Sequence, residues 1–153
     1  MSEGLRLTAM PKEHFSDFAE SLSVGYAKDQ ADAGIWPRDE ALFKARMTTM
    51  ELLPDGVATK DHFLWEVMQG EAFVGTLWVF QEEKTYFIYD ILIFDAFQNK
   101  GLGSALLVLL EENAKERGIT EISLHAFAHN KRAVHVYKKM GFEVVDITMR
   151  KYV

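Results

Sequence analysis

Two glycines separated by one residue stand between a strand-like and a helix-like segment of the chain. Gly101 and Gly103 lack a Cβ, so the backbone there can approach a ligand closely. The amide N–H groups of the first helical turn would point at that ligand, and the helix dipole favours negative charge. Asn99 tolerates left-handed backbone angles, Ser104 offers a hydroxyl and Lys100 a positive charge. The pattern predicts a phosphate or diphosphate site. The alternative is a strand-to-helix turn in which the glycines only provide flexibility.

Two other phosphate-binding motifs fit this stretch poorly. A P-loop needs Gly-Lys-Ser/Thr after four spacer residues, whereas the order here is Lys-Gly-Leu-Gly-Ser. A dinucleotide-binding fingerprint needs a small residue three positions after Gly103, where Leu106 stands. It also needs an acidic residue at the end of the next strand, where the sequence SLHAF has none.

A second motif, NKRAVHVYKKMGF, follows the next strand-like segment. With both motifs in view, the chain resembles the GNAT superfamily of acyl-CoA-dependent N-acyltransferases. The pyrophosphate arm of that family reads Gln/Arg-x-x-Gly-x-Gly/Ala, and here Gln98 to Gly103 have that order. The later family motif falls on Asn130, Ala133, Tyr137, Gly141 and Phe142. The resemblance is close over residues 85–142. In the remainder of the chain, only the order of the helices and strands is similar to the family.

The resemblance implies that acetyl-CoA is the co-substrate. His125, His129 and His135 are not spaced as a metal site on one face, so no metal is expected. In such proteins the strand before the loop splays from its neighbour and lends backbone groups to the pantetheine arm, a role that falls on Leu92 and Ile93. Asn130 would add a polar contact to the same arm, or cap its helix, or both. Asn99 departs from the glycine that the family often has there. The diphosphate would lie on the backbone amides of Gln98, Asn99, Lys100, Gly101, Leu102, Gly103 and Ser104.

The resemblance also implies a general acid, Tyr137, whose hydroxyl would protonate the leaving thiolate. The alternative is an ordinary core tyrosine, because Tyr137 shares a helix face with Ala133 and Met140. The motif does not identify the general base that must take a proton from the attacking amine. Asp90 is the preferred candidate because it lies on the strand before the loop.

His125 and Glu66 remain alternative bases, and each of the three could equally be an ordinary strand residue. His14 and His62 are expected on the surface. The first two helices of the family shape the acceptor pocket, so acidic and aromatic side chains in residues 26–43 could receive a cationic amine. These are Tyr26, Asp29, Asp32, Trp36, Asp39 and Glu40.

The composition is that of one soluble domain of 153 residues, with a net charge of −6 and no cysteine. Direct transfer in a ternary complex is therefore expected, because no thiol can carry the acetyl group. Acidic residues exceed basic ones in residues 1–83, and basic residues are slightly in excess in residues 84–153. The acidic balance argues against a nucleic-acid partner, and no segment predicts a membrane span or a signal peptide. A cytoplasmic location is expected.

Hydrophobic periodicity predicts a single α/β domain over residues 1–153, a mixed sheet with the order β-α-α-β-β-β-α-β-α-β. Gly70 and Glu71 should form a hairpin turn, and Gly118 should end the third helix. The strands are expected at 4–10, 62–70, 72–81, 85–94, 120–128 and 142–153, and the helices at 11–26, 38–53, 101–117 and 130–140.

The sequence thus predicts an acetyl-CoA-dependent N-acetyltransferase that acts on a primary amine of a small molecule. One alternative is a catalytically inactive CoA-binding sensor or interaction module. Another is an acetyltransferase acting on protein or peptide amines. Many members of the family form homodimers, but no segment of the sequence identifies an interface.

Overall fold

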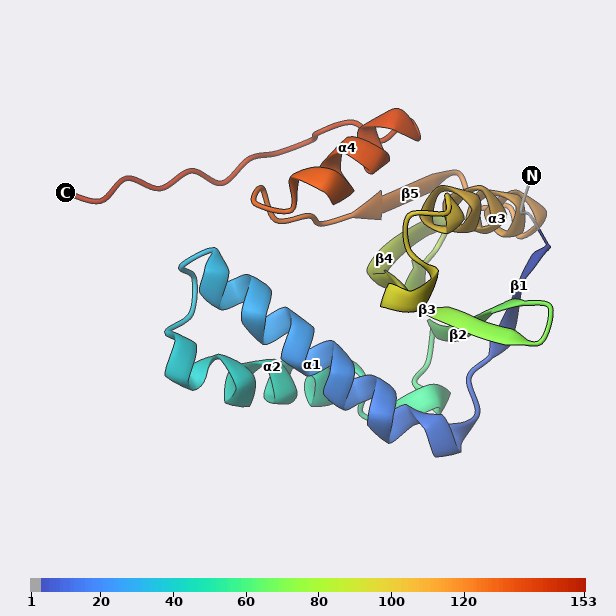
Figure 1. The fold of residues 1–153 in the computed structure, drawn as a ribbon, viewed down its shortest axis with the longest axis horizontal. Coiled ribbons are helices and arrows are strands. Elements are labelled where there is room, and N and C mark those ends of the chain that lie inside the picture. Colours follow the sequence, from blue (N-terminus) through green and yellow to red (C-terminus); the bar gives the residue numbers. More distant parts are fainter. Residues whose placement is uncertain (1–3) are drawn as a thin grey trace.

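A computed structural model describes residues 4–153 and contains one five-stranded mixed sheet with helices on both faces (Figure 1). The strands lie side by side in chain order, antiparallel except for the last pair, which is parallel. The predicted α/β class is confirmed. The strands are β1 (Leu5–Ala9), β2 (His62–Gln69), β3 (Ala72–Glu82), β4 (Thr85–Ile93) and β5 (Glu121–Leu124), and the helices are α1 (Phe15–Asp32), α2 (Arg38–Leu52), α3 (Leu102–Glu116) and α4 (Lys131–Lys139).

The predicted turns at two glycines are present. Gly70 has a φ of 61° and, with Glu71, joins β2 to β3. Gly118 has a φ of 74° directly after α3, the left-handed conformation that commonly ends a helix. Both positions need a backbone angle that only glycine adopts without strain.

The main core lies between the sheet and α3. Val67, Leu77 and Tyr86 from the strands pack with Leu106 and Leu110 from the helix, and all five side chains are fully buried. The buried Tyr86 hydroxyl donates a 2.7 Å hydrogen bond to Oδ1 of Asn113 on α3. This contact fixes α3 along the strand that precedes the glycine loop.

The opposite face of the sheet is covered by α1 and α2. Phe18 of α1 packs against Leu64 and Trp78 of the sheet. The two helices approach each other closely through the small buried residues Ala27 and Ala45, in a cluster that includes Ala41.

The predicted end of the first helix at Tyr26 is wrong, because α1 continues to Asp32. The polar segment after Tyr26 is helical because Ala27 packs against α2, and Gln30 is buried as well. Gly34, with a φ of 69°, then begins the connection to α2. The extension carries Asp29 to the mouth of a cavity described below.

A β-bulge changes which way β4 presents its side chains. Trp78 of β3 pairs with Asp90, but the next residue, Val79, pairs with Ile88, so Tyr89 is an extra residue. Before the bulge, Tyr86 and Ile88 face the core under α3, whereas after it Ile91 and Ile93 do so. A one-residue insertion shifts the alternation by one position. Asp90 therefore faces the α1 side of the sheet instead of the core.

The predicted closing strand at 142–153 is absent, since residues 143–153 belong to no strand. The chain leaves α4 and runs away from the sheet toward the end where α1 joins α2 (Figure 1). Arg150 is held there, because its Nη1 donates hydrogen bonds to the carbonyl oxygens of Ala33 and Gly34 at 3.0 and 3.1 Å. The segment has the alternating apolar pattern of a strand, but in this structure it does not lie beside a sheet edge.

Candidate active site

A groove of about 790 Å³ lies where β4 ends, between the glycine loop and the start of α4. The structure brings all but one of the sequence-predicted cofactor residues to its walls. Lys100 is the exception: its Nζ lies 5.9 Å from the centre of the Phe97 ring. The residues on the walls are Leu92, Ile93, Gln98, Asn99, Gly101, Leu102, Gly103, Ser104 and Asn130.

One wall of the groove is a strand that has separated from its neighbour. The parallel pairing of β4 with β5 ends at Ile88 and Leu124, whereas β4 continues to Ile93 with β3 on its other side. From residue 89 onward, the edge of β4 toward β5 has no strand partner within the described chain. Leu92 and Ile93 lie in this part and offer backbone groups for an extended ligand.

The loop adopts the conformation that its residue types favour. Asn99 and Gly101 have φ values of 63° and 77°, both left-handed. No side chain caps the N-terminus of α3, which leaves the first-turn N–H groups available to a ligand. A Cβ built on Gly101 or Gly103 would meet no atom within 4 Å, so both glycines face open space. The groove therefore has room for a diphosphate against the helix N-terminus.

Two hydrogen bonds hold the loop against its surroundings. Nε2 of Gln98 donates to the carbonyl oxygen of Ile93 at 2.8 Å. The guanidinium of Arg132 on α4 donates to Oδ1 of Asn99. Arg132 and its neighbour Lys131 line the groove and add positive charge, which suits an anionic ligand. Sequence reasoning missed both, although they directly follow Asn130 in the recognised motif.

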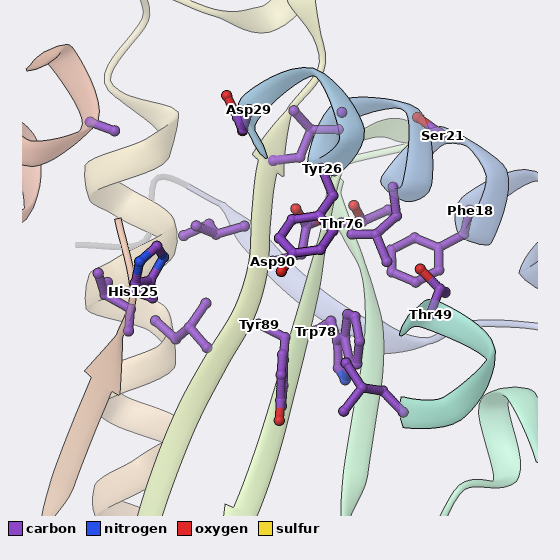
Figure 2. Close-up of a pocket in the computed structure, with 18 of the residues that line it drawn as sticks. Phe18, Ser21, Tyr26, Asp29, Thr49, Thr76, Trp78, Tyr89, Asp90 and His125 are labelled. Carbon is purple, nitrogen blue, oxygen red and sulfur yellow. The ribbon is translucent and has the colours of Figure 1, made fainter. Parts of the chain in front are cut away.

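A second cavity, of about 870 Å³, lies between α1 and the sheet (Figure 2). Figure 2 shows Tyr26 reaching from α1 toward the strands, with Trp78, Tyr89 and Asp90 on the sheet side. The rings of Trp78 and Tyr89 are stacked, with centroids 4.5 Å apart. The cavity thus combines aromatic walls with carboxylates.

The groove and the cavity meet at the start of α4 and the end of β4. Tyr137, Asn130 and Leu92 line both of them. Tyr137 therefore stands at the junction of a space that suits an anionic, extended ligand and one that suits a cationic, partly apolar ligand.

Tyr137 at the junction and Asp90 in the cavity both have perturbed pKa values. Burial raises the pKa of Asp90 from its usual 3.8 to about 7. Within the described chain, no ion pair or hydrogen bond to its carboxylate offsets that burial. Burial, and secondarily the charge of Asp90, raises the pKa of the Tyr137 hydroxyl above 10.0. At neutral pH, Tyr137 keeps its proton and Asp90 is close to half-ionised, the states that a general acid and a general base need.

The alternative bases are placed differently. His125 lines the cavity, but it is exposed and its ring packs edge-on against Phe127 at 4.9 Å. Glu66 is buried, and its Oε2 lies 2.6 Å from Nδ1 of His14. That hydrogen bond raises the pKa of His14.

His14 and His62, both expected on the surface, differ in their exposure. His14 is exposed but borders the cavity and contacts Glu66. The expectation for His62 is wrong, because it is half-buried and accepts a 2.8 Å hydrogen bond from Nε1 of Trp78. Burial lowers the pKa of His62, so the neutral ring is favoured. Leu64 and Glu66 are two positions apart on β2 and therefore lie on the same face. In the sequence, this alternation was the available indication of where Glu66, the partner of His14, would point.

Of the acidic and aromatic residues expected to line an acceptor pocket, only Tyr26 and Asp29 do so. Asp32 is engaged by Lys28 and Arg38, and their hydrogen bonds lower its pKa to about 2. The other three, Trp36, Asp39 and Glu40, do not line the cavity.

Asp29 connects α1 to the segment before α4. Its Oδ1 lies 3.2 Å from Nε2 of His129 and accepts a 3.5 Å hydrogen bond from Nδ2 of Asn130. Asn130 occupies the N-cap position of α4, yet its side chain makes no capping hydrogen bond. The contact brings α1 and α4 together over the cavity.

Within residues 4–153, no group of three or more His, Asp or Glu side chains is arranged to hold a metal ion. No helix in that part of the chain has the length and apolar character needed to cross a membrane.

Comparison with known proteins agrees with this geometry. The model of the acetyltransferase (GNAT) family matches residues 26–142. The N-acetyltransferase YdgE of Bacillus subtilis is 35% identical over 151 residues, covering 95% of this chain and 96% of that protein. The N-acetyltransferase YycN of the same organism is 33% identical over 152 residues, covering 96% and 97%.

Solved structures show the same fold. The crystal structure of YycN has a TM-score of 0.93 at 31% identity and covers 97% of this chain and 98% of that one. The PaiA N-acetyltransferase of Thermoplasma acidophilum, solved in complex with coenzyme A, has a TM-score of 0.72 at 19% identity over 94% and 92%. The matched family and the full-length relatives together identify the chain as a member of the GNAT family and as an acetyltransferase.

Proposed function

We propose that this acetyltransferase moves an acetyl group from acetyl-CoA to a primary amine of a small molecule, by direct attack in a ternary complex. The observation that carries the proposal is the junction at Tyr137 of a groove suited to an anionic cofactor and a cavity suited to an amine. The PaiA structure, which has this fold and was solved with coenzyme A, supports a CoA thioester as the donor.

The residues of the groove fit the donor. The diphosphate would lie on the first-turn amides of α3, beside Gly101 and Gly103, with Lys131 and Arg132 nearby. The pantetheine arm would run along the free edge of β4 at Leu92 and Ile93. Bound in this way, the cofactor supplies an acetyl group activated as a thioester.

In the transfer, the amine nitrogen attacks the thioester carbonyl carbon and the carbon–sulfur bond breaks. Asp90 takes a proton from the amine, and the Tyr137 hydroxyl protonates the departing sulfur. A covalent acetyl-cysteine step has no basis, because the chain contains no cysteine. We infer that the amine attacks the bound thioester directly.

The form of the cavity favours a small amine over a protein. Its volume of about 870 Å³ lies within the usual range for small-molecule sites. Asp29 and Asn130, which are in contact, both line this cavity and join α1 to the segment before α4. Aromatic faces and carboxylates together suit a cationic amine with an apolar portion.

Binding of the donor is tested by thermal unfolding with acetyl-CoA, CoA and NADH in parallel. A ligand that binds only the folded state raises the melting temperature by mass action. We expect a rise with acetyl-CoA and with CoA but not with NADH. No rise with either CoA compound would refute the assignment of the groove.

Catalysis is then tested by thiol release from acetyl-CoA over a panel of small amines and of peptides with free N-termini or lysines. The proposal expects acceleration by at least one small amine. Release stimulated only by peptides would replace the small-molecule acceptor with a polypeptide. Release stimulated by no acceptor, despite binding, would point to an inactive CoA-binding module.

A further inference from the structure

Glu66 is a buried carboxylate in the cavity that the proposed transfer does not use. Its side chain is 8% exposed and lines the cavity together with that of His14. Its Oε2 accepts a 2.6 Å hydrogen bond from Nδ1 of His14. Within the described chain, no residue donates to its other oxygen, Oε1, yet this oxygen is not sealed from solvent. Oε1 can therefore accept a hydrogen bond from a ligand.

The register of the sheet relates Glu66 to Asp90. Glu66 of β2 pairs with Thr76 of β3. Two positions further along β3, Trp78 pairs with Asp90 of β4. With strands about 4.8 Å apart and a rise of about 3.4 Å per residue, the Cα atoms of Glu66 and Asp90 lie roughly 12 Å apart. Both line the same cavity, and Figure 2 shows Thr76 and Asp90 on its sheet side.

The wall of the cavity is acidic. Four carboxylates line it, and the described wall contains neither lysine nor arginine. The pKa of His14 is raised mainly by its hydrogen bond to Glu66 and, to a smaller extent, by the charge of Asp17, so these two carboxylates lie at the same end of the cavity. A wall of this charge attracts cationic ligands. The four carboxylates are those of Asp17, Asp29, Glu66 and Asp90.

A protonated amine fits the free oxygen of Glu66 better than a neutral group does. An ammonium offers three N–H donors and no acceptor, so it can pair with a carboxylate without bringing an acceptor that needs a partner of its own. Its hydrogen bonds to a carboxylate are also about twice as strong as those between neutral groups. A hydroxyl could donate to Oε1 as well, but it would leave the buried charge uncompensated.

We propose that the acceptor carries two amines, and that Glu66 binds the second one as an ammonium while the reacting nitrogen lies at Asp90. The inference rests on the proposed function, because it takes the cavity to be the acceptor site. The distance between the two carboxylates requires a chain of several methylene groups between the nitrogens, which would cross β3 over Thr76 and Trp78. Glu66 thus determines specificity and takes no part in proton transfer.

The first test compares acceptors of equal length by thiol release at saturating acetyl-CoA. A series from diaminopropane to diaminooctane is measured beside the monoamine and the amino alcohol of each length. We expect kcat/KM for at least one diamine to exceed that of both matched compounds by about tenfold or more, the effect of one charged hydrogen bond. That is more than the twofold gain that two equivalent reactive ends provide. Equal values at every length would overturn the inference.

Three variants then locate the preference. Glu66→Gln keeps the shape and removes the charge, and it should lower kcat/KM for the preferred diamine about tenfold, mainly through KM, with a far smaller effect on the monoamine. Glu66→Asp withdraws the carboxylate by one methylene and should shift the preference to a longer diamine. Glu71→Gln removes the same charge at an exposed turn outside the cavity and should keep the preference. A preference that survives in Glu66→Gln would overturn the inference.

The ring of His14 gives a readout that does not depend on catalysis. A cation beside Glu66 weakens the support that this carboxylate gives to the His14 imidazolium. In an NMR titration with CoA present, the preferred diamine should therefore lower the pKa of His14, whereas an equal concentration of the monoamine should not. His135, which is exposed on α4 and does not line the cavity, is the reference. The same titration of His14 with both amines would overturn the inference.

The kinetic comparison separates the two levels of the argument. Turnover of monoamines and diamines at equal rates would refute the site for the second amine and leave the proposed function intact. Turnover of no amine at all would refute the proposed function and this inference with it.

Discussion

Asp90 on β4 and Tyr137 on α4 line the same cavity, and the charge of Asp90 contributes to the raised pKa of the Tyr137 hydroxyl. The pair comes from segments 47 positions apart in sequence, and the bulge at Tyr89 is what turns Asp90 toward this cavity. The proposed mechanism gives the two groups separate proton-transfer roles and leads directly to a dependence of rate on pH.

The pH profile of kcat/KM should contain a limb that rises through pH 7. Asp90 has a pKa of about 7 and acts as a base only when deprotonated, so the rate gains from its ionisation as pH increases. Asp90→Asn should lose this limb and lower kcat by roughly 10²–10⁴-fold, the usual contribution of a general base. Ionisation of the acceptor amine changes kcat/KM of the parent protein and of Asp90→Asn in the same way, so it does not account for a difference between them. If the variant kept the limb, the base would be another group, with His125 the first to examine.

Asp90→Asn should also change stability in a way that depends on pH. The folded-state pKa of about 7 lies above the usual 3.8, so the folded protein binds this proton more tightly than the unfolded chain does. Ionisation of Asp90 therefore leaves the free energy of unfolding unchanged below pH 4. Between pH 4 and 7 it destabilises the folded state progressively, and above pH 7 the penalty is on the order of 4 kcal/mol.

The variant should accordingly melt higher than the parent at pH 8 and close to it at pH 4. Thermal unfolding across that range measures the difference. A constant difference at all pH values would show that the carboxylate is not strained by burial.

Tyr137→Phe should preserve binding of CoA and slow turnover. The ring remains to pack against Phe142, whose centroid lies 5.9 Å away, while the proton donor is lost. We expect a decrease in kcat of about 10²-fold or more, with little change in the dissociation constant for CoA. Calorimetry and thiol release measure the two quantities. Unchanged turnover would move the general acid to another residue or to water.

Gly103→Arg should abolish CoA binding without unfolding the protein. A Cβ at this position meets no neighbouring atom, and the φ of Gly103 is not in the left-handed region, so the fold can accommodate a side chain. The arginine would nevertheless extend into the groove. Glu116→Gln on the same helix changes the charge by the same amount and should bind CoA normally. Retained affinity in Gly103→Arg would show that the loop is only a turn.

His14 should titrate above the usual 6.5 because of its hydrogen bond to Glu66. The bond stabilises the folded state at pH values below 6.5, and the stabilisation disappears as pH rises through the folded-state pKa. Glu66→Gln should lower the pKa of His14 in an NMR titration. His125, whose ring does not contact Glu66, provides the reference in the same spectra.

The loop and its partner motif could be predicted from sequence because their requirements are local. The left-handed angles of Asn99 and Gly101 follow from residue type, and the spacing from Asn130 to Tyr137 lies within a single helix and its cap. The bulge could not be predicted. The strand TYFIYDILIF is apolar on both faces, so the pattern carries no sign of where its alternation changes.

Two other features depend on contacts that no local pattern specifies. The contact of Glu66 with His14 spans 52 positions and exists only once β2 and the start of α1 are in place. The apolar alternation of residues 143–153 predicts a strand that is absent, because a strand also needs an edge to pair with. The sequence contains no information in that segment about which edge it would be.

The bulge in β4 also limits how such a site can change during evolution. Substitutions alter one side chain at a time, but no single substitution can restore the alternation that one inserted residue has displaced. Deleting Tyr89 would remove the bulge, but Asp90 would then directly follow the core-facing Ile88 and would still face α1, while Ile91 and Ile93 would still face the core. Gradual drift can therefore reshape the lining of the cavity while the direction in which position 90 points stays fixed, because neither a substitution nor the loss of the inserted residue reverses it.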